Sequence, residues 1–256
     1  MNDFPRIIHQ SWKTIKLRPD YEKYSQTWKD LNPDYQHILW TDENNLKLIE
    51  EKDPTFVDSY NSYNHYIKRA DAARYYYMYV YGGIYADLDF ECLRNFDNIL
   101  NENRDYDVIV GYTPRSITPI PNALMISKPG AKFWLHLIRL MKSRVNMFDP
   151  PMETGPFLLD GAIQTYPFKQ EIKIADRSAF YELLWDDPHA DINYKDFEKL
   201  TKEEKLEEAP KSYAVSYWSS SWKSRPDSKE NPNGLTHRGT VIEGMKTRAE
   251  KNEWVQ

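Results

Sequence analysis

The sequence predicts an α/β protein with a single domain. Short apolar runs of strand length alternate with helix-length segments from the start of the chain, which is the opening pattern of an α/β fold. The chain has 256 residues, 40% of them hydrophobic and 14% aromatic, so it can bury a substantial core and lacks the composition of a disordered protein. No repeat or break in composition requires a boundary. One domain over residues 1–256 is therefore the simplest organisation.

The N-terminal third of the chain has the clearest elements. Aromatic residues at helical spacing over 21–31 predict a helix that ends before Pro33. A longer segment without internal glycine or proline predicts a helix that stops at Gly82 and Gly83, which allow a sharp turn into the next strand. The predicted elements are a strand at 6–12, a helix at 21–31, a strand at 36–40, a helix from Thr41 or Asp42 to about 51, a helix at 67–83 and a strand at 84–90.

The rest of the chain continues this alternation. A proline-rich turn at Pro114, Pro119 and Pro121 separates two apolar runs. The predicted elements are strands at 107–113, 122–127 and 172–176, helices at 131–144 and 155–166, a solvated charged helix or loop at 196–209, and a late strand at 212–218. From residue 219 the chain is polar and interrupted by glycine and proline.

The overall charge and the single cysteine argue against several classes of protein. A formal net charge of -5 gives no sign of wholesale binding to nucleic acid or to a membrane surface. One cysteine leaves no intramolecular disulfide and no cysteine-rich metal site. The N-terminus does not read as a secretory signal, and no run of about 18 apolar residues predicts a membrane span. We expect a soluble protein of a reducing, cytoplasmic compartment, with a luminal or host-cell location as the alternative.

Three acids stand at alternate positions in the stretch YGGIYADLDFE, which ends at Glu91. In an extended chain Asp87, Asp89 and Glu91 share one face, because successive side chains point to opposite sides. Oxygen ligands of this kind suit Mg²⁺ or Mn²⁺, and such ions commonly bridge to substrate phosphates. The stretch therefore predicts a divalent-cation site that binds a diphosphate, with an acidic solvated loop as the alternative.

In a wider context the chain resembles glycosyltransferase family 32, the DXD-containing sugar transferases. The resemblance rests on IIHQSWK, NPDY followed by LW, RADAARYYYMYVYGGIYADLD, and a late SSW. It is strong over about residues 5–95 and returns at 213–222. That family is similar in its core to the large clostridial glucosylating toxins. The resemblance implies a GT-A fold, a Rossmann-like mixed sheet flanked by helices, with a donor-binding core at about 5–130 and a closing segment at about 210–256.

The resemblance also implies roles for individual residues. Asp89 would be the main metal ligand, and Asp87 would face the ribose, the donor sugar or the ion. Asp71 and Arg74, three positions apart on one helical face, would bind hydroxyls of the donor sugar, with a surface ion pair as the alternative. Tyr85 points away from the acids in a regular strand, whereas the family places this tyrosine beside the donor. A local bulge would reconcile the two.

Several aromatic and imidazole side chains have competing interpretations. Trp12 matches a family aromatic that stacks on the nucleotide base, with core packing as the alternative. His9, on the same predicted strand, is expected to be structural. The tyrosines of the predicted helix at 67–83 surround it, which predicts that the helix is buried and that most of them belong to the core: Tyr75, Tyr76, Tyr77 and Tyr79.

The C-terminal part departs from the family at one position. Relatives often carry a histidine where this chain has Ser216, and a hydroxyl is a weaker metal ligand than imidazole. The third metal ligand is therefore open. Ser220 and Trp222 are candidates for contact with the ion or the diphosphate, and His237 is the nearby imidazole that would substitute.

Taken as a whole, the resemblance implies a retaining hexosyltransferase in which Asp87, Asp89 and Arg74 carry catalysis. It would use Mn²⁺ or Mg²⁺ and a nucleotide-diphosphate sugar; the toxin-like core favours a UDP-hexose, with GDP-mannose as the alternative. The acceptor would be a glycan, lipid or protein, bound by the loops at 112–122 and 145–156. Glu153 and Asp160 are further candidates near it, although nothing in their spacing requires that role. The alternatives are a metal-dependent phosphatase or nucleotidyl transferase, and a non-catalytic nucleotide-sugar or glycan-binding module.

Overall fold

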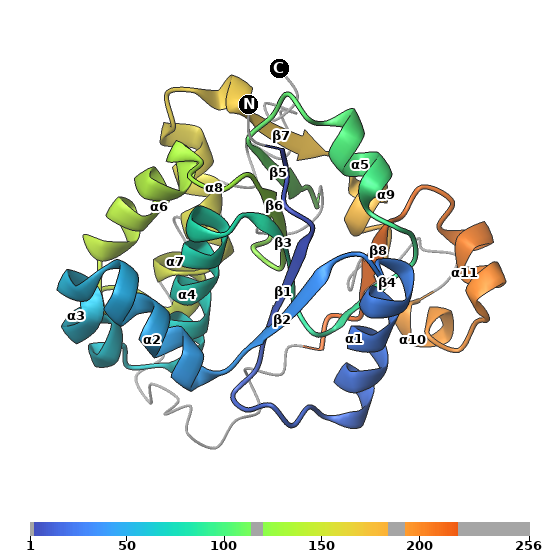
Figure 1. The fold of residues 1–256 in the computed structure, drawn as a ribbon, viewed down its shortest axis with the longest axis horizontal. Coiled ribbons are helices and arrows are strands. Elements are labelled where there is room, and N and C mark those ends of the chain that lie inside the picture. The colour runs from blue at the N-terminus through green and yellow to red at the C-terminus, as the bar shows by residue number, and fades with distance from the viewer. Residues whose placement is uncertain (1–2, 114–119, 184–192, 220–256) are drawn as a thin grey trace, which may run out of the picture.

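Figure 1 shows the computed structural model of the chain, which describes residues 3–113, 120–183 and 193–219. Within these residues, a six-stranded sheet runs through the middle of the molecule and helices cover both of its faces. The strands lie in the order β2 (Gln36–Trp40), β1 (Ile7–Ser11), β3 (Gly83–Ala86), β6 (Leu124–Ser127), β5 (Val108–Gly111) and β7 (Ile172–Ala175). The predicted α/β fold with a mixed sheet is confirmed.

The direction of the strands determines where a ligand site can form. β1 is parallel to β2 and β3, whereas β6 is antiparallel to β3 and β5, and β7 is parallel to β5. Strands β1, β2 and β3 therefore end at the same edge of the sheet, where ligands of open α/β sheets commonly bind. Just beyond the end of β3, two short strands form a separate antiparallel pair: β4 (Phe90–Cys92) and β8 (Ala214–Ser216).

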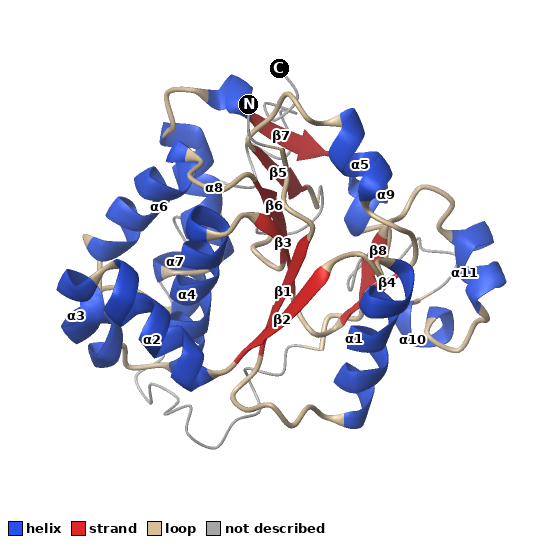
Figure 2. Ribbon diagram, viewed as in Figure 1, coloured by secondary structure: helices blue, strands red, loops and turns tan. Residues whose placement is uncertain are grey.

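Figure 2 shows a group of helices on each side of the sheet. On one side lie α2 (Asp42–Lys52), α3 (Val57–Ser62), α4 (Tyr66–Val80), α6 (Lys132–Lys142), α7 (Pro150–Glu153) and α8 (Pro156–Thr165), with a 3₁₀ turn at Pro54–Phe56. On the other lie α1 (Pro19–Leu31), α5 (Asp97–Glu102), α9 (Arg177–Phe180), α10 (Tyr194–Phe197) and α11 (Lys202–Glu208); a second 3₁₀ turn, Lys169–Glu171, precedes β7. The helices predicted at 21–31, 67–83, 131–144 and 155–166 are confirmed as α1, α4, α6 and α8. No helix in the described ranges has both the length and the apolar character needed to cross a membrane.

The sheet builds a core on each face. Val108, Val110 and Tyr85 belong to the cluster under α4, α6 and α8, whereas Ile84 and Ile109 belong to the cluster that includes α1. Neighbouring residues of a strand thus pack on opposite sides, as the pleat of a strand requires.

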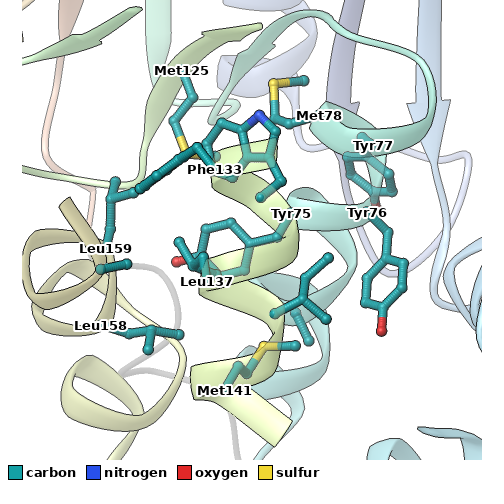
Figure 3. Packing of buried hydrophobic residues seen from close by; sticks show 14 of the residues in the cluster. Tyr75, Tyr76, Tyr77, Met78, Met125, Phe133, Leu137, Met141, Leu158 and Leu159 are labelled. Carbon is teal, nitrogen blue, oxygen red and sulfur yellow. The ribbon is translucent and has the colours of Figure 1, made fainter. Parts of the chain in front are cut away.

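Helix α4 is buried on nearly every side. Tyr75, Tyr76 and Tyr77 are at most 3% exposed, and Tyr79 is partly buried. Figure 3 shows Tyr75 lying against α6, while Tyr76 and Tyr77 lie on the other side of α4. The prediction that these tyrosines belong mostly to the core is confirmed.

The turn from α4 into β3 depends on two glycines and a histidine. Gly82 and Gly83 have φ angles of +64° and +87°, and a Cβ at Gly83 would lie 2.5 Å from the carbonyl oxygen of Ile7. His9 Nε2 donates to the carbonyl of Gly82 at 2.8 Å, while Nδ1 accepts from the indole of Trp40 at 3.0 Å. Burial lowers the pKa of His9 to about 4, so the ring is neutral. The structural roles predicted for these residues are confirmed.

The strand predicted at 84–90 is wrong in its second half. β3 ends at Ala86, residues 87–89 form a turn closed by the N–H of Phe90 on the carbonyl of Asp87 at 3.1 Å, and β4 begins at Phe90. Asp87 still donates its N–H to the carbonyl of Ala123 at 2.8 Å, and beyond it the chain leaves the large sheet to pair β4 with β8. Consequently Asp87, Asp89 and Glu91 do not line one face of an extended strand.

Glu91 is the acid that this turn separates from the others. Its carboxylate is buried, with Lys205 Nζ at 2.8 and 3.0 Å and a hydrogen bond from the hydroxyl of Tyr217. Lys205 comes from the charged segment at 196–209, which was predicted to be solvated. Most of that segment is exposed, but Lys205 is 4% exposed because it pairs with Glu91.

We predict that Gly83→Ala lowers the free energy of unfolding by at least about 2 kcal/mol, because the added Cβ meets the backbone of Ile7 at a positive φ. Gly161→Ala is the matched control. No atom lies within 4 Å of a Cβ built at Gly161 in α8, so this change should be neutral or stabilise by up to about 1 kcal/mol. Urea denaturation of both variants measures the difference, and equal effects would contradict the role of the turn.

Candidate active site

A pocket with a cavity volume of about 280 Å³ lies where β1 and β3 end. Its lining includes Ser216 and all of the described residues that were predicted to bind the donor or the metal: Trp12, Asp71, Arg74, Tyr85, Asp87 and Asp89. Ser220, Trp222 and His237 lie outside the described residues. The pocket therefore brings together residues from β1, α4, β3, the turn after β3 and β8.

Arg74 is at the centre of the polar lining. Its guanidinium lies 3.1 Å from Asp71 Oδ1 and 3.2 Å from Asp87 Oδ1, and it donates to the carbonyl of Asn122 at 2.8 Å. The cation also lies 4.5 Å from the centre of the Tyr85 ring, a favourable cation–π geometry. Arg74 is 4% exposed and Asp71 5%, so the alternative of a surface ion pair is excluded.

The turn at 87–89 brings Tyr85 to the acids. The hydroxyl of Tyr85 donates to Asp87 Oδ1 at 2.6 Å, although the two side chains alternate along a regular strand. The regular-strand expectation for Tyr85 is therefore wrong, and the tyrosine lies at the pocket beside Asp87 through a turn rather than a bulge. The cause is the turn itself, since Asp87 no longer belongs to β3.

Asp89 receives the N–H of Ser219 on Oδ2 at 2.8 Å, and its carbonyl accepts the N–H of Tyr217 at 2.9 Å. Burial and the negative charge of Asp87 raise the pKa of Asp89 to about 6. Burial likewise raises the pKa of Asp71 to about 6, opposed by the positive charge of Arg74. Both carboxylates are therefore costly to ionise in the free protein.

Trp12 and Ser216 lie at the pocket in different ways. Trp12 is partly buried and packs edge-to-face on Tyr21 at 5.1 Å, and Tyr21 in turn shares a 2.8 Å hydrogen bond with Ser219 Oγ. Ser216 is buried in β8, and its Oγ accepts the N–H of Trp218 at 3.2 Å. Trp12 packs on Tyr21 and also lines the pocket, so the packing alternative holds in part and stacking on a nucleotide base stays a prediction.

Two residues that hold Asp71 in place were not predicted from the sequence. Asn122 Nδ2 donates to Asp71 Oδ1, and Thr154 Oγ1 donates to Asp71 Oδ2, each at 3.1 Å. Only their positions within the predicted acceptor loops could have drawn attention to them.

Glu153 and Asp160, the further candidates near the acceptor, are buried and are not among the residues that line the described pocket. Glu153 instead pairs with Lys68 at 3.0 Å.

The charges of the lining suit a divalent cation. Asp42, Asp71, Asp87 and Asp89 stand against Lys13 and Arg74, an excess of two negative charges when all are ionised. Carboxylate oxygens are ligands for Mg²⁺ and Mn²⁺. Within the described part of the chain, no group of three His, Cys, Asp or Glu side chains gathers as a complete site. A bound ion would therefore need oxygen ligands beyond these side chains, which the phosphates of a substrate could supply.

The raised pKa of Asp89 predicts a pH-dependent cost in stability. A carboxyl whose pKa is higher in the folded than in the unfolded state favours folding when protonated, and this contribution is lost as the pH rises from about 4 to about 6. Asp89→Asn cannot ionise. Its stability relative to the wild type should therefore increase between pH 4 and pH 7.5 in metal-free buffer, as measured by urea denaturation. Asp58→Asn, which removes an exposed carboxylate in α3, is the control, and an equal change in both variants would contradict a cost specific to Asp89.

Comparison with known proteins agrees with this geometry. Residues 19–110 match the model of the glycosyltransferase sugar-binding region containing DXD motif. Over 167 residues the chain is 38% identical to a mannosyl phosphorylinositol ceramide synthase of Saccharomyces cerevisiae, covering 63% of this chain and 43% of that protein. Over 160 residues it is 38% identical to inositol phosphoceramide mannosyltransferase 3 of Schizosaccharomyces pombe, covering 60% and 43%. The chain thus spans less than half the length of these relatives.

Among solved structures, the ligand-free glycosyltransferase domain of the YGT toxin has a TM-score of 0.52 to this chain at 10% identity, covering 68% of this chain and 80% of that one. At this identity the likeness concerns the fold alone, and it agrees with the predicted GT-A core. The resemblance inferred from the sequence motifs is confirmed by the family match over the helix α4 and the D-x-D turn. Residues 19–110 therefore carry the DXD sugar-binding region of glycosyltransferases, on a GT-A-type fold.

Proposed function

We propose that this chain is a retaining glycosyltransferase that moves mannose from a nucleotide-diphosphate donor to a hydroxyl of an acceptor. One observation carries the proposal: Asp71 and Arg74 of α4 and Asp87 and Asp89 after β3 line one pocket at the ends of parallel strands. The sequence match to the sugar-binding region covers all four of these residues. The two relatives above are named for transfer to phosphoinositol ceramides.

The names of the relatives support mannose as the sugar of the donor. The toxin-like core favoured a UDP-hexose, but a relative that is 38% identical over 160 residues is named a mannosyltransferase, whereas the toxin domain is 10% identical. We therefore infer GDP-mannose as the donor. Trp12 would stack on the base, and Asp71 and Arg74 would bind hydroxyls of the sugar.

A divalent cation, Mn²⁺ or Mg²⁺, would be held by Asp87 and Asp89 together with the diphosphate of the donor. When bound, it would supply positive charge that stabilises the leaving diphosphate. The protein contributes the orientation of its ligands. Asp87 is held by Arg74 and Tyr85, and Asp89 by the N–H of Ser219, so neither carboxylate is free to turn away. Preorganised charge of this kind is a major source of catalysis.

The acceptor would approach over an apolar part of the lining. Tyr66, Ile67, Pro150, Pro151 and Pro156 line the pocket and carry no charge. The three prolines belong to the segment at 145–156, which was predicted to contact the acceptor. We infer a hydroxylated head group on an apolar carrier, in agreement with the lipid named for the relatives.

Release of nucleotide diphosphate tests the proposal. The wild type with Mn²⁺ should release GDP from GDP-mannose, and more slowly or not at all UDP from UDP-glucose or UDP-galactose. Asp89→Ala should lose at least about a hundredfold in turnover, because it removes charge stabilisation at the leaving group. Asp58→Ala controls for the loss of a carboxylate elsewhere. Binding of GDP-mannose without turnover would favour the non-catalytic module, and release of inorganic phosphate would favour the phosphatase.

Because position 216 carries serine and not histidine, we make a second prediction, about the affinity for Mn²⁺. Because no three metal-ligating side chains gather among the described residues, Mn²⁺ should bind much more tightly when GDP is present, and GDP more tightly when Mn²⁺ is present, since such coupling is reciprocal. Ser216→His should tighten Mn²⁺ binding in the nucleotide-free protein, provided that the melting temperature shows intact folding. Calorimetry measures both. Tight Mn²⁺ binding to the free wild type, unchanged in Ser216→His, would mean that another residue completes the site.

A further inference from the structure

One face of helix α4 contacts the segment that precedes α8. Lys68, Asp71 and Tyr75 lie three and four positions apart, so they share a face. The ammonium of Lys68 lies 3.0 Å from Glu153 Oε2, and the hydroxyl of Tyr75 donates to the carbonyl of Thr154 at 2.6 Å. Between them, Thr154 Oγ1 donates to Asp71 Oδ2 at 3.1 Å. Thr154 is thus held on both sides and is itself fully buried.

Asn122 contacts the same carboxylate from the loop before β6. Its amide donates to Asp71 Oδ1 and to the hydroxyl of Tyr75, each at 3.1 Å, while its carbonyl accepts from Arg74 at 2.8 Å. Asn122 is 7% exposed. Its side chain and its backbone therefore fix both members of the Asp71–Arg74 pair.

These contacts leave Asp71 little capacity for a ligand. A carboxylate accepts about four hydrogen bonds, two on each oxygen. Arg74 and Asn122 occupy Oδ1, and Thr154 occupies one position on Oδ2. One acceptor position on Oδ2 remains, on a residue that lines the pocket.

We propose that Thr154 and Asn122 are positioning residues that restrict Asp71 to a single hydrogen bond from one hydroxyl of the donor sugar. This inference rests on the proposed function and adds the source of its sugar specificity. A site built to bind one hydroxyl rejects a sugar that lacks it or carries it on the other face, because the buried acceptor is then unpaired. Without the Thr154 hydroxyl the carboxylate can rotate, and its second oxygen accepts hydroxyls less selectively.

The test compares two ligands across matched variants. Thr154→Val removes the hydroxyl and keeps the shape, Thr154→Ser keeps the hydroxyl, and Thr165→Val removes an exposed hydroxyl on α8 as a control. Calorimetry with Mn²⁺ measures the affinity of each for GDP-mannose and for GDP. Thr154→Val should bind GDP-mannose about tenfold more weakly, in line with the loss of one hydrogen bond to a charged group. Its affinity for GDP should be unchanged, and Thr154→Ser and Thr165→Val should match the wild type.

If Thr154→Val does not fold, Asn122→Ala and a measurement of turnover test the same positioning role. Asn122→Ala removes the amide but keeps the carbonyl that Arg74 contacts, and it should show the same selective loss. In turnover, either variant should also discriminate less between GDP-mannose and GDP-sugars in which a single hydroxyl is inverted, such as GDP-glucose, inverted at C2. A folded variant that keeps wild-type affinity for GDP-mannose, or that loses affinity for GDP equally, overturns the positioning role. A wild type that binds neither ligand contradicts the proposed function itself.

Discussion

Arg74 is a charged side chain with 4% of its surface exposed, so its place in the core depends on the groups that accept its N–H donors. Those groups come from three places in the chain: Asp71 one turn earlier in α4, Asp87 after β3, and the carbonyl of Asn122 before β6. Burying a guanidinium is tolerated only with such partners, and removal of either acid would leave charge unpaired. The helix, the D-x-D turn and the loop before β6 are therefore positioned by one cation.

Two further buried ion pairs hold the rest of the pocket. Lys68 and Glu153 fix the segment that carries Thr154, while Lys205 and Glu91, with Tyr217, fix the pair of strands beside Asp89. The partners are 85 and 114 residues apart in the sequence. Buried ion pairs add little net stability, but breaking one is costly. We therefore infer that they determine which segments meet at the pocket more than how stable the protein is.

The pocket itself opposes folding to a small degree. Burial and neighbouring negative charge favour the protonated forms of Asp71 and Asp89, and four carboxylates face two cations in the lining. The tyrosines and tryptophans packed around α4 offset this cost, since each large ring removes much apolar surface from water. Such an energetic cost is expected at a site where a bound ligand supplies the compensating positive charge.

The sequence by itself determined the local features of this protein. Helical spacing located α1, α4, α6 and α8, and the glycines at 82 and 83 located the turn into β3, because both depend on neighbours in the chain. The motif from Arg69 to Asp89 identified the sugar-binding region, since these residues lie on adjacent elements. Only the tertiary structure decided that β3 ends at Ala86, that Glu91 pairs with Lys205, and that Asn122 and Thr154 hold Asp71. Each of those depends on contacts between residues that are distant in the sequence. The local sequence pattern does not show which distant residues will come into contact, because folding decides it.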